Sequence, residues 1–485
     1  MKMIKGTEEQ EKIWNELENG DSHVMVYAGA GTGKTFTIVQ GSKRISGEKM
    51  GFLAFNKAIV KELDAKLPSD CKAVTFHSLG LAAIKRIDRR SKVSGFKTRN
   101  IIEIVLGKKY KSKTALAKLI SLMKSSMVFT PDVDRNTMLN IISMYNIEFD
   151  GVRDRNNAFD AMPDLYRRSV TTEQIDFDDM IWLPIVMQLS IEHFGVLFVD
   201  EAQDFNEAQR QLILKACNGG RMVVVGDPNQ AIYGFRGADS ASMGLFESTL
   251  EKSSRGVKKF TLSKTFRCPK SIVAEANRYV PEYHCHDDAD EGTVTVNATF
   301  NPSEGDMVLC RVNAPLIEKC FAMIADGKPA YVLGRDIGTS LKTLVKKIKM
   351  SEDMPIEIFL PQLKDYVTEA KRTLRLQEKD KQAEGLQDRY DCIIHLTRNA
   401  VSIKGLLDNI ETIFKDGKNR GVVFSTIHKA KGLESNSVWI IKTDVMPHPM
   451  AKSAADRKQE NNLCYVAITR AMKNLYYVGD RVGKA

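Results

Sequence analysis

The sequence predicts an α/β protein built on parallel sheets that helices cover. Short apolar runs rich in β-branched residues alternate with stretches of helical periodicity, which is typical of such sheets. A glycine-rich loop stands between one of these runs and a helix-compatible stretch. The chain has 485 residues and is too long for one ordinary domain. The runs form two groups, before and after residue 260, so we expect two α/β domains.

The strand candidates are short and β-branched. They are Val24–Tyr27, Gly51–Phe55, Ala73–Phe76, Val196–Val199, Met222–Val225, Val422–Phe424, Val438–Ile441 and Leu475–Val478. Residues 85–170 and 341–417 lack such runs and have helix-like spacing, so we expect each to be a mostly helical insertion. Leu250–Gly256 is the clearest candidate for a linker between the two domains.

The composition excludes several classes of protein. Hydrophobic residues make up 43% and charged residues 27% of the chain, as in a globular protein. No apolar stretch is long enough for a membrane span, and Met1–Gly6 lacks the apolar core of a signal peptide. The eight cysteines include no C-x-x-C pair, which suits reduced thiols in a cytosol. We therefore expect a cytoplasmic protein without membrane contact.

Positive charge is concentrated in one segment. The net charge is +10, and residues 81–130 contain thirteen Lys or Arg against two acids, Asp88 and Glu103. A basic face of this density suits a polyanion, most commonly nucleic acid. A solvated lysine-rich surface would look the same in the sequence, so both interpretations remain open.

The glycine loop is the most informative segment. Its small residues let backbone N–H groups wrap a phosphate chain at the positive end of the following helix. The loop consists of Ala28, Gly29, Ala30, Gly31, Thr32, Gly33, Lys34 and Thr35. In such a P-loop Lys34 reaches the β- and γ-phosphates of ATP, and Thr35 holds Mg²⁺. Alanine replaces the usual first glycine, which is a small change.

A second carboxylate-bearing segment completes an ATPase pattern. The apolar run Val196–Val199 ends in Asp200 and Glu201. Asp200 at the tip of the strand is placed to hold Mg²⁺, and Glu201 to orient and deprotonate the attacking water. An apolar run before two acids has many chance matches, but the P-loop earlier in the chain favours the interpretation that Asp200 and Glu201 belong to an ATPase site.

The segments in their order resemble the motifs of superfamily 1 helicases, above all the UvrD/Rep/PcrA group, with some likeness to the F-box DNA helicase branch. The motifs span nearly the whole chain. They are Thr7–Gln10 (Q), Ala28–Thr35 (I), Leu53–Ala58 (Ia), Thr75–Leu79 (Ib), Asp176–Asp179 (an acidic stretch), Asp200–Asp204 (II), Gly226–Ala238 (III), Thr265–Pro269 (IV), Ser425–Glu434 (V) and Tyr465–Ala471 (VI).

The resemblance implies further roles at the ATP site. Gln10 would pair with the adenine edge, Phe266 would stack on the adenine face, and Glu434 would hold the ribose. Arg267 and Arg470 would reach the γ-phosphate, which suits a guanidinium because it is always charged and binds phosphate oxygens bidentately.

The resemblance also implies DNA contacts. Gln230 would sense the γ-phosphate and couple it to DNA. Phe55, Tyr233 and Phe235 would form a base-stacking platform, which is sequence-tolerant; each alone would also suit core packing. The remaining candidates for DNA contact are Asn56, His77, Arg236, Thr426 and His428.

The implied architecture is two RecA-like P-loop domains, each with a mostly helical insertion. The expected ranges are 1–84 and 171–257 for the first domain, 85–170 for its insertion, 258–340 and 418–485 for the second domain, and 341–417 for a shortened second insertion. The implied function is an ATP- and Mg²⁺-dependent 3′-to-5′ DNA helicase or translocase in replication, repair or recombination.

The expected partners are single-stranded DNA, single-strand/duplex junctions and single-strand-binding or replication and repair proteins. The expected form is a monomer in a bacterial or virus-infected host cytoplasm, associated with the nucleoid. Three alternatives stay open: a translocase with little unwinding, an RNA helicase, and a nucleotide-gated DNA-binding module.

Overall fold

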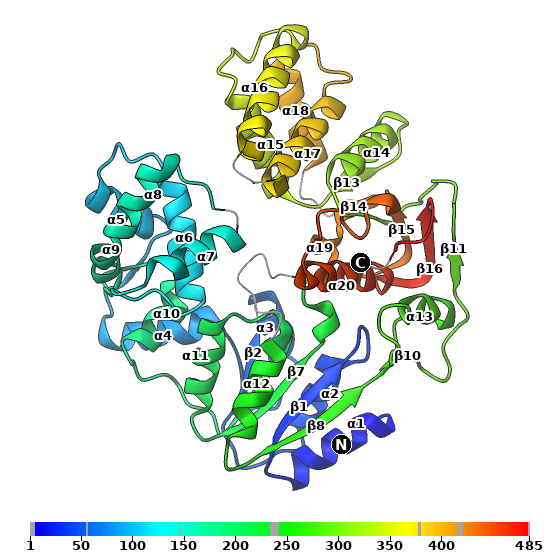
Figure 1. The fold of residues 1–485 in the computed structure, drawn as a ribbon. Coiled ribbons are helices and arrows are strands. Elements are labelled where there is room, and N and C mark those ends of the chain that lie inside the picture. The colour runs from blue at the N-terminus through cyan, green and yellow to red at the C-terminus, as the bar shows by residue number, and fades with distance from the viewer. Residues whose placement is uncertain are drawn as a thin grey trace. The chain divides into compact units, whose positions relative to one another are not determined.

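The chain folds into two compact units, Met1–Leu262 and Ser263–Ala485. The structure is a computed structural model that describes residues 5–54, 57–145, 147–232, 242–376, 380–414 and 421–483. Each unit contains one six-stranded sheet in which every pairing is parallel (Figure 1). The predicted α/β class with two parallel sheets is therefore confirmed.

The first sheet positions the glycine loop. Its strands in spatial order are β3 (Cys71–Thr75), β2 (Met50–Ala54), β6 (Val196–Val199), β7 (Arg221–Gly226), β1 (His23–Ala28) and β8 (Val257–Leu262). Its helices are α1 (Glu8–Asn19), α2 (Lys34–Ser42), α3 (Lys57–Asp64), α4 (Phe76–Ile87), α11 (Glu207–Cys217) and α12 (Ser242–Glu251).

The two faces of this sheet bury different side chains of the same strands. Val24 and Val26 of β1 pack in the cluster with Ile13 and Ile38, whereas Met25 packs in the cluster on the other face. The alternation is the period of two expected of a strand. Both faces are apolar, so the sheet lies between two layers of helices.

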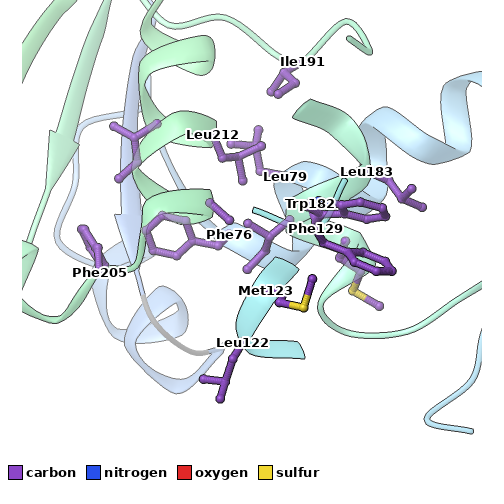
Figure 2. Packing of buried hydrophobic residues seen from close by; sticks show 14 of the residues in the cluster. Phe76, Leu79, Leu122, Met123, Phe129, Trp182, Leu183, Ile191, Phe205 and Leu212 are labelled. Carbon is purple, nitrogen blue, oxygen red and sulfur yellow. The ribbon is translucent and has the colours of Figure 1, made fainter. Parts of the chain in front are cut away.

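Five helices and a short strand pair form the first insertion. They are β4 (Lys92–Val93), α5 (Lys97–Leu106), α6 (Lys113–Ser125), α7 (Arg135–Met144), α8 (Gly151–Asp160), α9 (Met162–Ser169) and β5 (Gln174–Ile175), and α10 (Asp179–Val186) follows. They share one core with the sheet, which Figure 2 shows around Phe76, Phe129 and Trp182. Phe129 packs on Trp182 with ring centroids 5.4 Å apart.

A buried ionic cluster joins this insertion to the rest of the first unit. Lys97 Nζ lies 2.6 Å from Asp179 Oδ2, and Lys124 Nζ lies 2.8 Å from Asp179 Oδ1 and 3.2 Å from Asp176 Oδ2. Lys97, Lys124 and Asp179 are each at most 2% exposed. Burial lowers the pKa of Lys124, but the charges of Asp179 and Asp176 outweigh it and leave that pKa raised. Two of the thirteen cations in residues 81–130 are thus core residues, unavailable to a polyanion.

The prediction that Leu250–Gly256 links the two domains was wrong, because this segment lies inside the first unit. Its first residues belong to α12, and the Gly256 carbonyl accepts the His23 backbone N–H at 3.1 Å. β8 then pairs in parallel with β1 along its length. The first compact unit extends to Leu262. The sequence analysis did not predict β8 because Lys258 and Lys259 interrupt its apolar pattern. An edge strand tolerates such exposed charges, whereas a central strand does not.

The second sheet has the spatial order β11 (Thr293–Thr295), β16 (Ala471–Val478), β15 (Ser435–Ile441), β12 (Met307–Cys310), β14 (Val422–Thr426) and β13 (Ala330–Val332). Its helices are α13 (Lys270–Ala276), α14 (Ala314–Ala325), α19 (Ile427–Ala430) and α20 (Ala454–Ile468), and β9 (Lys264–Thr265) pairs with β10 (His284–Cys285). None of the helices in the described ranges is long and apolar enough to cross a membrane.

The second insertion is a helical bundle that packs on α14. It consists of α15 (Arg335–Lys346), α16 (Ile356–Leu376), α17 (Asp380–Leu396) and α18 (Ile403–Ile413), which Figure 1 shows grouped together. Leu316 and Ile317 of α14 share one apolar cluster with helix α17. Asp388 of α17 accepts the backbone N–H groups of Asn313 (3.1 Å) and Ala314 (2.9 Å), which caps the start of α14. The bundle and the sheet of this unit therefore form one body.

Replacing Lys124 with methionine is expected to reduce the free energy of unfolding by about 3–5 kcal/mol, because Asp179 would keep its burial and lose a counter-charge. Chemical denaturation followed by circular dichroism measures the change. Lys109→Met, at an exposed position, is the matched control, with an expected change within about 0.5 kcal/mol. Equal losses in the two variants would contradict a special role of the buried cluster.

Replacing Asp388 with alanine is expected to destabilise the second unit by about 0.5–2 kcal/mol, as the loss of a helix cap does. Asp391→Ala on the same helix is the control, since Asp391 accepts a hydrogen bond from Gln387 within α17 and does not cap α14. Thermal unfolding of both variants gives the comparison. A control that loses as much as Asp388→Ala would show that the cap does not hold the bundle.

Candidate functional site

The P-loop joins β1 to α2 through two glycines with left-handed backbone. Gly31 and Gly33 have φ of 68° and 78°, a conformation that other residues rarely adopt. Among the described residues no side chain caps the start of α2, so its first N–H groups can bind a ligand. Thr32 Oγ1 donates to the Gly29 carbonyl at 3.0 Å and holds the loop closed. The segment therefore has the geometry of a phosphate cradle.

Lys34 points back over its own loop. Its Nζ lies 3.3 Å from the Gly29 carbonyl and 3.5 Å from that of Ala28. These are weak partners for a cation, and phosphate oxygens would replace them at a gain. Lys34 is therefore poised over the loop.

The two candidate metal ligands meet. Thr35 Oγ1 donates to Asp200 Oδ2 at 2.7 Å, which brings the start of α2 and the end of β6 together. Burial and the adjacent Glu201 charge raise the pKa of Asp200 to about 6, while Thr35 and Lys34 oppose the rise. A hydroxyl and a carboxylate this close fit Mg²⁺, which takes oxygen ligands and usually one or two carboxylates together with phosphates and water.

Glu201 has an unusual backbone. Its φ is 55°, in the left-handed region, and its N–H donates to Asp200 Oδ1 at 2.8 Å. Such a conformation costs about 1–3 kcal/mol for a residue with a side chain. The turn separates the two carboxylates, so that Asp200 meets Thr35 while Glu201 Oε2 accepts the Gln203 amide at 2.5 Å.

Gln230 lies at the end of the neighbouring strand. β7 ends at Gly226, and Gln230 Nε2 donates to Asp227 Oδ2 at 2.8 Å. Both side chains are at most 5% exposed. Burial raises the pKa of Asp227, while Lys34 and Gln230 oppose it. The carboxyl ends of β1, β6 and β7 thus carry motifs I, II and III at one edge.

Gln10 is engaged within the protein. Its side-chain oxygen accepts the Thr7 N–H at 3.0 Å in a capping box, and its Nε2 donates to Thr37 Oγ1 at 3.1 Å. The residue is 3% exposed. The capping box begins α1, and the bond to Thr37 ties α1 to α2. A contact with adenine would require the amide to leave these partners.

Arg267 and Arg470 converge on one turn of the second unit. Arg267 Nε donates to Glu434 Oε2 at 2.6 Å, and its Nη1 lies 3.4 Å from the Thr469 carbonyl. Arg470 is 1% exposed and donates to the carbonyls of Val466 (2.9 Å) and Leu433 (3.1 Å). Burial and the nearby Arg267 lower the pKa of Arg470 to about 10, so it still carries its charge at neutral pH.

Phe266 is half-exposed, and its ring packs on His286 with centroids 4.9 Å apart. Thr426 is the N-cap residue of α19, and His428 lies within that helix. An exposed ring next to the paired Arg267 and Glu434 is suited to stacking on a base.

The structure describes three of the residues predicted to contact DNA, namely His77, Thr426 and His428. His77 lies in the first turn of α4, and burial lowers its pKa, so the ring is neutral at pH 7. Phe55, Asn56, Tyr233, Phe235 and Arg236 lie outside the described residues.

Phe177 is among the exposed aromatic residues that the sequence analysis did not single out. Phe177 is 60% exposed and meets the His77 ring edge-on, with centroids 6.0 Å apart. Its signal was an apolar ring inside the acidic stretch Asp176–Asp179, whose outer aspartates are buried. The ring between them is exposed.

Comparison with known proteins finds two family matches in the chain. The UvrD/REP helicase N-terminal domain matches residues 7–251, and the UvrD-like helicase C-terminal domain matches residues 339–479. The first match alone covers more than half of the chain.

Three curated relatives illustrate the similarity. F-box DNA helicase protein 1 of Schizosaccharomyces pombe is 24% identical over 97% of this chain and 57% of its own length. F-box DNA helicase 1 of Gallus gallus is 23% identical over 97% and 49%. The ATP-dependent DNA helicase PcrA of Staphylococcus aureus is 26% identical over 56% and 39%.

The chain spans about half the length of the F-box relatives that it matches. The first match contains the P-loop and the Asp200–Glu201 pair, and the second contains Arg470, whereas Arg267 lies between the two matched ranges. By these matches the chain belongs to the UvrD-like helicase family.

Proposed function

We propose that this protein is an ATP-dependent DNA motor that moves 3′ to 5′ along single-stranded DNA and unwinds duplex. The observation that carries the proposal is the edge of the first sheet, which brings together Lys34, Thr35, Asp200 and Glu201, side chains of the kinds that ATP hydrolysis uses. A protein that only binds nucleotide needs no carboxylate to activate water. The family membership supports ATP as the nucleotide and DNA as the nucleic acid along which the protein moves.

The proposed chemistry assigns one task to each group. The N–H groups at the start of α2 and the Lys34 ammonium bind the phosphates. Mg²⁺, held by Thr35 and Asp200, would neutralise developing charge on the phosphate oxygens. Glu201 orients the attacking water and takes its proton. Arg267 and Arg470 stabilise the charge on the γ-phosphate, a role worth about 10³–10⁵ in rate in related NTPases.

For Arg267 this role requires an exchange of partners. Its guanidinium is now neutralised by Glu434, and a phosphate would compete for the same donors. Glu434 would then be free for the ribose hydroxyl. Phe266 would offer its exposed face to adenine.

On the DNA side, Phe177 and His77 offer an exposed ring and a neutral imidazole side by side. Stacking on an aromatic ring is worth about 1–3 kcal/mol per base and tolerates every sequence. The platform of Phe55, Tyr233 and Phe235 is proposed on the sequence motifs alone.

A translocase with little unwinding is the second candidate. The observation that favours it is the second insertion, whose four helices share one core with α14 and do not form a separate body. A small bundle that packs on α14 leaves less of its surface available to a duplex than a separately folded domain of the same size would.

Replacing Glu201 with glutamine is expected to lower kcat for ATP hydrolysis by about 10²- to 10⁴-fold, because the amide cannot take a proton. Binding of a fluorescent ATP analogue should persist. Glu207→Gln in α11 is the matched control, since Glu207 pairs with Arg210 and not with the site. Hydrolysis by Glu201→Gln at the parental rate would remove the catalytic assignment.

ATP hydrolysis is expected to rise when single-stranded DNA is added, and a partial duplex with a 3′ tail should be unwound in preference to one with a 5′ tail. Stimulation without unwinding would favour the translocase. Preference for the 5′ tail would contradict the polarity, and stimulation by RNA alone would make RNA the substrate. Hydrolysis with no response to either nucleic acid would contradict the motor.

A further inference from the structure

Gln203 connects motif II to motif III. Its Nε2 donates to Glu201 Oε2 at 2.5 Å, and its Oε1 accepts the backbone N–H of Asp227 at 2.9 Å. Asp227 in turn accepts a hydrogen bond from Gln230. One amide therefore links the candidate general base to the candidate γ-phosphate sensor, which follows another strand. Gln203 is 2% exposed, so water does not compete for these bonds.

The backbone is shaped to admit this amide. A Cβ at Gly226 would lie 2.6 Å from Gln203 Oε1 and 2.7 Å from Met243 Sδ, closer than side chains approach. Gly226 is not among the glycines with positive φ, so its backbone does not require glycine. What requires glycine is the space that the Gln203 amide occupies. The contact is therefore built into both motifs.

A second hydrogen bond ties motif II to the helix that follows motif III. Ser242 Oγ, at the start of α12, donates to the Ala202 carbonyl at 2.8 Å, and Ser242 is 1% exposed. Motif II is thus held, at Gln203 and at the preceding Ala202, by elements that precede and follow the sequence positions proposed to contact DNA.

The orientation of the Glu201 carboxylate depends on the Gln203 amide. The left-handed backbone of Glu201 is strained, and its carboxylate accepts the Gln203 amide. A hydrogen bond from an amide to an ionised carboxylate is a strong one and fixes the direction of the carboxylate. A small shift of Asp227 would move Gln203 and re-aim the group that activates water.

We propose that Gln203 is a positioning residue through which the turn from Asp227 to Gln230 sets the orientation of Glu201, so that DNA bound through motif III accelerates ATP hydrolysis. The proposal rests on the function proposed above. It adds the route by which DNA regulates the ATP site within the first unit.

Gln203→Leu keeps a side chain of similar size and removes both hydrogen bonds. Gln203→Glu keeps an acceptor for the Asp227 N–H but loses the donor to Glu201. We expect both to lower kcat with a single-stranded oligothymidylate by about 10- to 100-fold, as misplacement of a catalytic group does. KM for ATP and nucleotide-free binding of the oligonucleotide should stay unchanged, whereas the thermal midpoint should fall, because each substitution leaves a buried polar group without a hydrogen bond. The ratio of hydrolysis with and without DNA should fall towards one.

The matched controls are Gln211→Leu and Gln211→Glu. Gln211 Nε2 also donates to a glutamate, Glu207 Oε1 at 2.7 Å, within α11 and away from motif III. Both controls should keep the wild-type ratio. If Gln203→Leu does not fold, Ser242→Ala decides the question, because it loosens the other anchor and should lower the same ratio with basal hydrolysis intact.

Three results would overturn the proposal. They are a wild-type ratio in the Gln203 variants, an equal loss with and without DNA, and a rise in KM for ATP that accounts for the whole effect. The proposed function fails separately: a wild-type chain that hydrolyses no ATP, or does so without acceleration by nucleic acid, removes both proposals. Acceleration of the wild type and of Gln203→Leu alike removes only the role of Gln203.

Discussion

The parallel order of β6, β7 and β1 is the constraint on which the candidate site depends. Strands that run in the same direction end at the same edge, so the segments after Ala28, Val199 and Gly226 meet, although they lie far apart in the chain. The 2.7 Å contact of Thr35 with Asp200 and the Gln203 bridge both follow from this order. Buried apolar side chains on both faces hold the strands in place.

The cluster of Lys97, Lys124, Asp176 and Asp179 buries four ionisable side chains in the first unit. Taking four charges out of water is unfavourable unless each is paired and hydrogen-bonded. Here Asp176 and Asp179 also accept each other's backbone N–H groups, at 3.0 and 2.9 Å, which fixes the turn before α10. The same turn carries the exposed Phe177 next to His77. A structural ion cluster thereby fixes the position of an aromatic ring on the surface.

The second unit keeps its two motif arginines in contrasting states. Arg267 is paired with the carboxylate of Glu434, whereas Arg470 is buried and donates to backbone carbonyls. A paired, partly exposed guanidinium can exchange its carboxylate for a phosphate at low cost, because one anion replaces another. The buried guanidinium keeps its direction, since two carbonyl oxygens and the Thr469 hydroxyl hold it.

The sequence by itself determined the fold class, the P-loop, the Asp200–Glu201 pair and the order of the motifs. These are local patterns, in which neighbouring residues carry the whole signal: a glycine-rich turn, an apolar run that ends in acids, a helix start. It did not determine which lysines of residues 81–130 are buried or that β8 is the edge strand next to β1. Nor did it determine that the Gln10 side chain forms hydrogen bonds with Thr7 and Thr37. Only the tertiary structure decided these points and the partners of Gln203, because most of them depend on residues far apart in the chain that strand order and packing bring together.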